Sequence, residues 1–452
     1  MKKNPVSIPH TVWYADDIRR GEREAADALG LTLYELMLRA GEAAFQVCRS
    51  AYPDARHWLV LCGHGNNGGD GYVVARLATA VGIEVTLLAQ ESDKPLPEEA
   101  ALAREAWLNA GGEIHASNIV WPESVDLIVD ALLGTGLQQA PRESISQLID
   151  HANTHPAPIV AVDIPSGLLA ETGATPGAVI NADHTITFIA LKPGLLTGKA
   201  RDVTGQLHFD SLGLDSWLAG QETKIQRFSA EQLSQWLIPR RPTSHKGDHG
   251  RVVIIGGDHG TAGAIRMTGE AALRAGAGLV RVLTRSENIA PLLTARPELM
   301  VHELTMDSLT ESLGWADVVV IGPGLGQQEW GKKALQKVEN FRKPMLWDAD
   351  ALNLLAINPD KRHNRVITPH PGEAARLLGC SVAEIESDRL HCAQRLVQRY
   401  GGVAVLKGAG TVVAAHPDAL GIIDVGNAGM ASGGMGDVLS GIIGDRKSTR
   451  LN

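Results

Sequence analysis

The sequence lacks the segments that would tie a protein to a membrane. No run of about 20 apolar residues, the length needed to cross a bilayer, occurs in the 452 residues. The N-terminus, MKKNPVSIPHTVWYADDIRR, has no apolar core of the kind found in signal peptides. We therefore expect no membrane partner and a cytoplasmic location.

Positive charge and cysteines are also scarce. The sum of 42 Lys and Arg against 51 Asp and Glu is 42 − 51 = −9, which argues against nucleic acid as a partner. The four cysteines show no C-x-x-C spacing, so we expect reduced thiols rather than a zinc site or a disulfide framework. Aromatic residues make up only 4% of the chain, whereas glycine occurs 49 times, which indicates heavy use of turns and close backbone approaches.

What the sequence does contain is an alternation of short apolar runs and helical segments. This pattern predicts an α/β fold with parallel strands and crossover helices, and the chain is too long for a single core. The alternation lapses around residue 225 and resumes at Arg251, so we predict two domains, residues 1–222 and 226–452. The expected strands are His57–Cys62, Ile83–Leu88, Val125–Ala131, Pro158–Asp163, Ala182–Phe188, a run from Arg251, Val318–Ile321, Met345–Trp347, Arg365–Ile367 and Ala404–Lys407.

The segment GHGNNGGDG, residues 63–71, follows the first expected strand. We predict a strand-to-helix turn here, with the helix running from Tyr72. The segment contains G-x-G-x-x-G, but Asp70 would repel the pyrophosphate that this motif seats in dehydrogenases. The nearest candidate for a ribose-binding acid, Glu91, lies in a loop of mixed charge. A hydride-transfer enzyme is therefore disfavoured.

Three further loops follow expected strands in the first half, and in a parallel sheet such loops meet at one edge. The loop from Gly134 has no acid before Arg142 and could cradle phosphate. Asn67, Asp130 and Ser166 are oxygen donors at three strand ends that could together hold a monovalent or divalent cation, although each could equally cap a turn.

Asp163 is the candidate for proton transfer in the first half. It ends the apolar strand IVAVD, where partial desolvation would raise the pKa of its carboxyl, although a turn residue would look the same. Lys192, on a neighbouring loop, is the nearest candidate cation.

In the second half, a glycine-rich turn precedes Asp437 and an apolar helix. Backbone N–H groups at such a helix start can neutralise a transferring phosphoryl group, and Asp437 could deprotonate the attacking hydroxyl. An Asp that merely caps the helix fits the turn about as well. The run Lys407-Gly-Ala-Gly-Thr411 follows another expected strand and could receive a nucleotide.

The ordered motifs NNGGDG, DALLGTGL and VDIPSGL, followed by HKGDHG, VVIIGGDHGTAGA, AALRAGAGLV, GPGLG, DADALNLL, TPHPGEAARLLG, VLKGAGTVV and NAGMASGGMGDVLSG, resemble the bifunctional NAD(P)H-hydrate repair enzymes. The resemblance implies two three-layer α/β/α domains, a Rossmann-like epimerase and a ribokinase-like, ADP-dependent dehydratase. Their substrate is NAD(P)H hydrated at C6 of the nicotinamide ring. The first domain would interconvert the R and S epimers of NAD(P)HX. The second would return the S form to NAD(P)H, converting ADP to AMP and phosphate.

The resemblance also implies site residues. K⁺ would be bound by Asn67, Asp130 and Ser166. NAD(P)HX would be bound in the epimerase by Asn66, Asn67, Gly68, Gly69, Asp70, Gly134, Thr135, Gly136, Leu137, Gln138, Gln139 and Ala140, with Asp163 transferring the proton. NAD(P)HX would be bound in the dehydratase by Ala264, Gly324, His370 and the catalytic Asp437. ADP, carried with Mg²⁺, would be bound by Lys407, Gly408, Ala409, Gly410, Thr411 and Gly436.

Alternatives remain open. The main one is a ribokinase-like small-molecule kinase fused to a non-catalytic nucleotide-binding module. The last eight residues, DRKSTRLN, break the apolar pattern where the family continues. We therefore expect that C-terminal helices are missing and that dehydratase activity is reduced. The sequence leaves open ADP against ATP, NADHX against NADPHX, and whether the chain forms a homo-oligomer.

Overall fold

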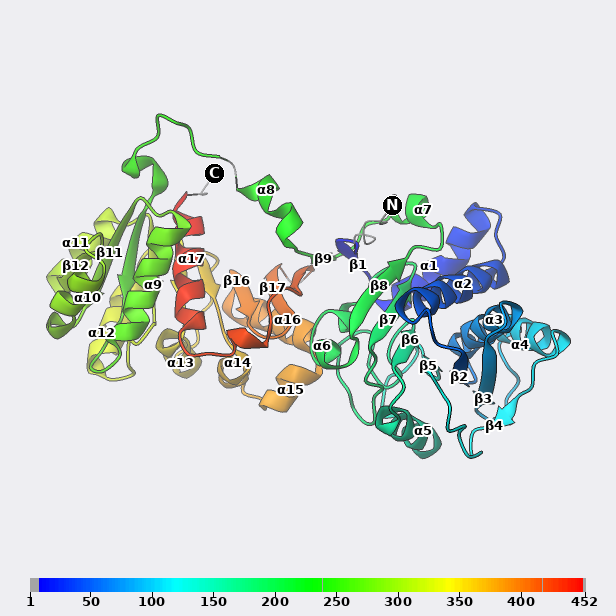
Figure 1. The fold of residues 1–452 in the computed structure, drawn as a ribbon. Coiled ribbons are helices and arrows are strands. Elements are labelled where there is room, and N and C mark those ends of the chain that lie inside the picture. Colours follow the sequence, from blue (N-terminus) through cyan, green and yellow to red (C-terminus); the bar gives the residue numbers. More distant parts are fainter. Residues whose placement is uncertain (1–7, 238, 417, 450–452) are drawn as a thin grey trace. The chain divides into compact units, whose positions relative to one another are not determined.

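The computed structural model describes residues 8–237, 239–416 and 418–449. The chain divides into two compact units, one ending at Arg227 and the other beginning at Phe228. In Figure 1 the first unit runs from blue to green and the second from green to red. Both combine helices with largely parallel sheets, so the predicted α/β class is confirmed. No helix of the described ranges has both the length and the apolar character needed to span a bilayer.

The first unit is built on a sheet with strand order β4-β3-β2-β5-β6-β7-β8, in which every neighbouring pair is parallel. Its strands are β2 (His57–Cys62), β3 (Glu84–Ala89), β4 (His115–Ala116), β5 (Leu127–Ala131), β6 (Ile159–Val162), β7 (His184–Phe188) and β8 (Gln206–Asp210). Two short strands, β1 (Thr11–Val12) and β9 (Ile225–Arg227), pair with each other. The helices are α1 (Ala15–Ala28), α2 (Leu33–Ala51), α3 (Asn66–Ala80), α4 (Glu98–Asn109), α5 (Glu143–Thr154), α6 (Ala200–Val203) and α7 (Asp215–Leu218).

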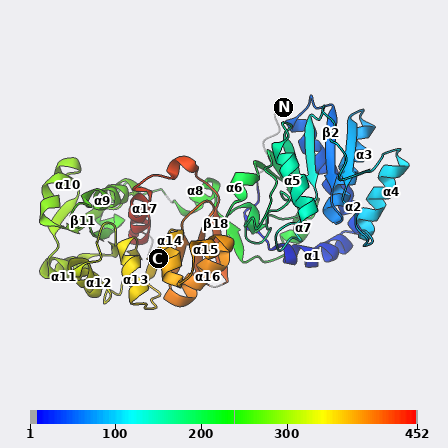
Figure 2. The same cartoon turned by 90° about the horizontal axis from the view of Figure 1, so that it is seen from below.

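The sheet of the first unit lies between two helical layers, with α2, α3 and α4 on one face and α5 on the other (Figure 2). Alternate side chains of β2 point to opposite faces of the sheet, as strand geometry requires. Trp58 and Val60 pack into the core beneath α2–α4, whereas Leu59 and Leu61 pack with α5. Because both faces are covered, β2 is apolar along nearly its whole length, which explains why this strand was recognisable from the sequence.

Helix α3 begins at Asn66, six residues before the start predicted at Tyr72. The glycines that suggested a long turn lie inside the first turns of the helix. A Cβ on Gly68 would lie 2.0 Å from the carbonyl oxygen of Gly63, and one on Gly71 would lie 2.7 Å from Cys62 Sγ. Here glycine permits the helix to approach the strand ends closely, and this packing outweighs its low helix propensity.

This reading predicts a large difference between two glycine substitutions in the same segment. Gly71→Ala should destabilise the first unit by about 1–3 kcal/mol, because the methyl group would also lie 2.8 Å from the Cβ of Ala131. Gly65→Ala is the matched control, since nothing lies within 4 Å of its Cβ position and its φ is −106°. Thermal unfolding of both variants checks the prediction, and equal melting temperatures would contradict it.

The second unit has a sheet in the order β18-β17-β16-β15-β14-β13-β10-β11-β12. Its strands are parallel except at β16–β17 and β17–β18. They are β10 (Arg251–Ile255), β11 (Leu279–Thr284), β12 (Met300–Glu303), β13 (Val318–Ile321), β14 (Met345–Trp347), β15 (Arg365–Ile367), β16 (Val403–Leu406), β17 (Thr411–His416) and β18 (Ala419–Ile423). The helices are α8 (Leu233–Trp236), α9 (Ala262–Ala275), α10 (Ile289–Ala295), α11 (Met306–Trp315), α12 (Glu329–Val338), α13 (Asp350–Ile357), α14 (Pro371–Leu378), α15 (Val382–Ser387), α16 (Arg389–Tyr400) and α17 (Met435–Thr449).

Helix α17, which follows the glycine-rich turn, packs beside α9 over the sheet (Figure 1). Two glycines of α17 make this approach possible. A Cβ on Gly441 would lie 2.2 Å from the backbone oxygen of Thr268 in α9, and one on Gly444 would lie 2.7 Å from Val320 Cγ2 in β13. The packing partners of this helix therefore come from earlier in the chain.

Candidate functional site

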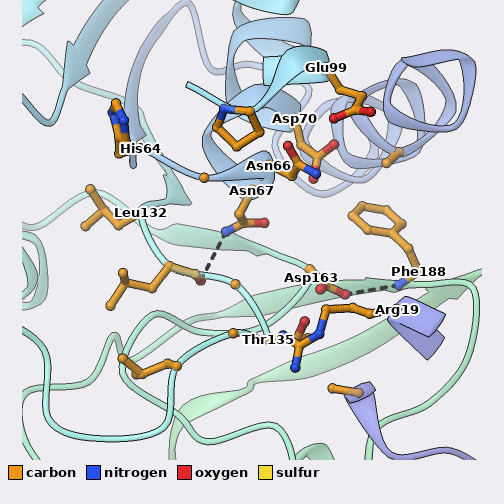
Figure 3. Close-up of a pocket in the computed structure, with 18 of the residues that line it drawn as sticks. Arg19, His64, Asn66, Asn67, Asp70, Glu99, Leu132, Thr135, Asp163 and Phe188 are labelled. Atoms are coloured by element: carbon orange, nitrogen blue, oxygen red, sulfur yellow. Dashed lines mark hydrogen bonds between the residues drawn. The ribbon is translucent and has the colours of Figure 1, made fainter. Parts of the chain in front are cut away.

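The first unit holds a cavity of about 990 Å³ at the carboxyl ends of β2 and β5. The chain runs from β2 outward through β3 to β4, and from β5 outward in the opposite direction through β6 to β8. The loops after β2 and β5 therefore diverge, which opens a crevice at this point of a parallel sheet. Figure 3 shows the side chains that line it.

Asp163 stands at this edge, directly after β6, with a left-handed backbone at φ 65°. One oxygen of its carboxyl, Oδ1, accepts hydrogen bonds from Lys192 Nζ at 2.6 Å and from Thr187 Oγ1 at 3.1 Å. Lys192 is only 3% exposed, and its Nζ also donates to Thr187 Oγ1 and to the Phe188 carbonyl. The two residues singled out at the strand ends thus form a largely buried ion pair, with the side chain of Lys192 4% exposed and that of Asp163 18% exposed.

Three more carboxyl groups, those of Glu22, Asp70 and Glu99, line the same cavity. Asp70 of α3 is 9% exposed, and its pKa is raised well above the ordinary range by burial and by the charges of Asp163 and Glu22. Burial and the Asp163 charge also raise the pKa of Glu22 in α1. Sequence reasoning missed Glu22, because nothing in the pattern of α1 indicates that this helix reaches the strand ends.

The three predicted cation ligands come together beside the cavity. Asp130 is fully buried and accepts hydrogen bonds from Ser166 Oγ at 2.6 Å and Ser166 N at 2.8 Å. Asn67 Nδ2 donates to the carbonyl of Leu133 at 3.1 Å, whereas Asn67 Oδ1 is buried without a hydrogen-bond partner. Burial raises the pKa of Asp130 to about 6. An unsatisfied amide oxygen beside a buried carboxylate suits a cation with oxygen ligands.

The other predicted residues of the first half divide into two groups. Asn66 and residues 134–140 line the cavity. Gly68 and Gly69 instead pack against backbone and side chains, since a Cβ on Gly69 would lie 2.6 Å from Met37. Positive side chains that the sequence did not single out, Arg19, Lys94 and Arg142, also line the cavity. They come from separate elements, so no local pattern links them.

The second unit gathers a cluster of charges at the carboxyl ends of β14 and β16 and the start of α17. Asp348, 2% exposed, accepts hydrogen bonds from Lys407 Nζ at 3.0 Å and from Ser440 Oγ at 2.8 Å. A Cβ on Gly436 would lie 3.2 Å from Lys407 Nζ, so the start of α17 lies against the lysine. Burial and the charge of Asp348 raise the pKa of Asp437. Sequence reasoning did not assign Asp348 a role.

The remaining predicted residues of the second half lie around this cluster. His370 caps α14, since its Nδ1 accepts hydrogen bonds from Gly372 N and Glu373 N. Glu373 lies 3.8 Å from Lys407 Nζ, and burial raises its pKa. In the predicted nucleotide run, residues 407–410 form the turn between β16 and β17, and Thr411 is the first residue of β17.

Ala264 and Gly324 lie at the reversal of strand order between β10 and β13. The hydroxyl of Thr261, at the start of α9, donates to the carbonyl of Gly324 at 2.9 Å, and Ala264 N donates to the carbonyl of Thr261 at 3.2 Å. Gly324 has φ 58°, and a Cβ there would lie 2.6 Å from the Thr261 hydroxyl oxygen. A glycine at this position is thus a steric requirement.

Comparison with known proteins assigns a family to each unit. Residues 33–194 match the family described as YjeF-related protein N-terminus, and residues 252–445 match NAD(P)H-hydrate dehydratase. Over all of its 452 residues the chain is 98% identical to the bifunctional NAD(P)H-hydrate repair enzyme Nnr of Escherichia coli (strain K12), of which it covers 88%.

Two further similarities are more distant. Over 97% of its length the chain is 48% identical to the bifunctional NAD(P)H-hydrate repair enzyme of Leishmania braziliensis, covering 85% of that protein. Among solved structures, the ADP/ATP-dependent NAD(P)H-hydrate dehydratase from Bacillus subtilis, co-crystallised with ATP/Mg²⁺, is 29% identical with a TM-score of 0.44. That match covers 50% of this chain and 81% of that one.

Proposed function

Because the chain belongs to the bifunctional NAD(P)H-hydrate repair enzymes, we propose how its two sites divide the repair of hydrated NADH and NADPH. The first unit is the epimerase domain and the second is the dehydratase domain. The proposal for the first site rests on one observation. Asp163 and Lys192 form a largely buried ion pair that lines the cavity. We place the enzyme in the cytoplasm, without a nucleic acid or membrane partner.

In the epimerase site, NAD(P)HX lies in the cavity, with residues 134–140 against its phosphates and Asn66 and Asp70 on the facing wall. Asp163 transfers the proton during inversion at C6. Its position supports this role, because three hydrogen bonds from Lys192 to groups around it hold the ion pair in one geometry.

A potassium ion fits beside this site. Asn67, Asp130 and Ser166 would hold it, and the buried Asn67 Oδ1 without a partner is the observation that favours a cation there. A bound cation would supply positive charge next to the substrate's phosphates and would satisfy the buried carboxylate of Asp130. The residues also fix the loop after β5, because Ser166 Oγ accepts a hydrogen bond from Leu133 N.

In the dehydratase site, ADP binds at Lys407–Thr411 and Gly436, and the S hydrate binds near Ala264, Gly324 and His370. Asp437 accepts the proton of the C6 hydroxyl as its oxygen attacks the terminal phosphorus of ADP, and AMP leaves. The lone pair of N1 then expels phosphate from C6, and loss of a proton from C5 restores the double bond. A raised pKa suits Asp437 to act as this base.

The charge of the second site supports the use of Mg²⁺ with the nucleotide. Asp348, Glu373 and Asp437 surround a single cation, Lys407, so the cluster would repel the phosphates of free ADP. Carboxylate oxygens are ligands that Mg²⁺ accepts, and the metal would offset the negative charge of both partners.

The proposal predicts the fate of a mixture of both NADHX epimers given ADP, Mg²⁺ and K⁺. We expect complete return of the absorbance of reduced nicotinamide, followed with chromatography of the remaining epimers. Consumption of the S epimer alone would contradict the epimerase assignment. A stable phosphorylated hydrate would instead indicate an ordinary small-molecule kinase.

Replacing K⁺ by Na⁺ should slow the loss of the R epimer but leave the loss of the S epimer unchanged. This difference would separate the effect of the potassium site from the activity of the dehydratase.

A further inference from the structure

The cavity of the epimerase domain holds more carboxyl groups than a single proton-transfer residue requires. Asp70 points into it from α3, and Asp163 enters from the end of β6 (Figure 3). We propose that Asp70 is a second catalytic residue, the acid that protonates the departing C6 hydroxyl while Asp163 accepts a proton from the incoming water. This inference rests on the epimerase function proposed above.

The two carboxyls differ in their surroundings. Asp163 accepts hydrogen bonds from a cation, Lys192, and from the hydroxyl of Thr187. Asp70 is nine-tenths buried, and the lysine that could neutralise it is already engaged with Asp163, Thr187 and Phe188. Two groups of one kind therefore lie in different environments, one paired with a cation and one without that partner, and acid–base catalysis uses such a difference.

The charges that face Asp70 come from every side of the cavity. Two carboxyl groups act on it, that of Glu22 in α1 and that of Asp163 after β6. The ammonium group of Lys192 acts in the opposite direction. Burial and the charges of Asp163 and Glu22 raise the pKa of Asp70 well above its ordinary range, whereas Lys192 lowers it. The net direction favours the protonated carboxyl that a general acid needs.

The chemistry of inversion uses both groups. The proton of Asp70 passes to the C6 hydroxyl, the C6–O bond breaks and water departs, and the lone pair of N1 forms a C6=N1 double bond. A water molecule then attacks the other face of C6. A lone pair of its oxygen forms the new C6–O bond, and the electrons of the C6=N1 double bond return to N1 as a lone pair. Asp163 takes the proton released by that water. In the net reaction the C6 oxygen is replaced by one from water and the configuration at C6 is inverted. One proton has moved from Asp70 to Asp163, and the reverse reaction returns that proton to Asp70.

The test compares Asp70→Asn with Glu171→Gln in the full chain, using re-equilibration of an epimer-enriched NADHX sample. Asparagine keeps the shape but has no acidic proton, so we expect the rate to fall by about 100-fold with little change in KM. Glu171 is a matched control, because burial also raises the pKa of its carboxyl but it lies outside the cavity. A wild-type rate for Asp70→Asn would overturn the proposal.

A second measurement on the unaltered protein guards against a misfolded variant. In H₂¹⁸O, each inversion should place one solvent oxygen at C6, read by mass spectrometry of both epimers. Inversion with retention of the original oxygen would overturn the proposal while leaving the epimerase function intact. Failure of the unaltered protein to re-equilibrate the epimers at all would instead refute the epimerase function itself.

Discussion

Asp163→Asn should slow epimerisation of NADHX by about 10³-fold while the S epimer is still dehydrated at the wild-type rate. The amide cannot accept the proton released at C6, and Lys192 loses the charge that holds its ammonium group at 2.6 Å. Asparagine tolerates the left-handed backbone of this position, φ 65°, so the turn itself should persist. Chromatographic separation of the epimers over time measures the rate.

The control for this variant addresses stability. Removing one partner of a buried ion pair leaves an uncompensated charge, which can unfold a protein rather than disable it. The double variant Asp163→Asn/Lys192→Met removes both charges and should recover stability in urea unfolding without recovering epimerisation. If the double variant regains the wild-type rate, Asp163 acts only through stability, and its assignment as the proton-transfer residue is wrong.

Asp437→Asn should lower the dehydratase rate by about 10³-fold and leave epimerisation unchanged. The base must be ionised to accept the proton of the C6 hydroxyl. Since burial and the charge of Asp348 raise the pKa of Asp437, dehydratase activity should fall as the pH drops through that raised value. Formation of NADH from S-NADHX and ADP across pH 4–8 measures both effects.

Asp348→Asn provides a control that moves this pH dependence rather than abolishing it. Without the neighbouring negative charge the pKa of Asp437 should fall, so the acid side of the rate profile should shift to lower pH. The same change removes the negative charge paired with Lys407 and leaves one acceptor oxygen where Lys407 Nζ and Ser440 Oγ use two, so a higher KM for ADP should accompany the shift. An unmoved profile would mean that another group limits the reaction in acid.

Much of the fold was predictable because many of its strands depend on a few consecutive residues. Strands buried on both faces, such as β2 and β13, are continuous apolar runs, and their bounds, His57–Cys62 and Val318–Ile321, were predicted as the structure has them. Shorter or more polar strands, among them β8 (Gln206–Asp210) and β12 (Met300–Glu303), were missed, because a partly exposed strand at the sheet edge resembles a loop in sequence.

The positions of the candidate site residues were predictable where they depend on strand ends. Residues at or directly after strand ends, such as Asp130, Asp163 and Lys407, were singled out because parallel strands bring their carboxyl ends to one edge. The glycines around residue 68 were assigned to a long turn, since the sequence cannot distinguish a glycine needed for a turn from one needed for close packing. That distinction depends on Gly63 and on residues of other elements.

The sequence by itself determined the α/β class, the strands of the two sheet centres and the loops that carry the chemistry, because each depends on a few consecutive residues. Only the tertiary structure placed Glu22 beside Asp70 and set Asp348 between Lys407 and Ser440. These groups are far apart in the chain, and the raised pKa values of Glu22 and Asp70 come from burial and from neighbours that folding supplies. The candidate catalytic residues could therefore be proposed from the sequence, whereas their burial and charged neighbours depend on the fold.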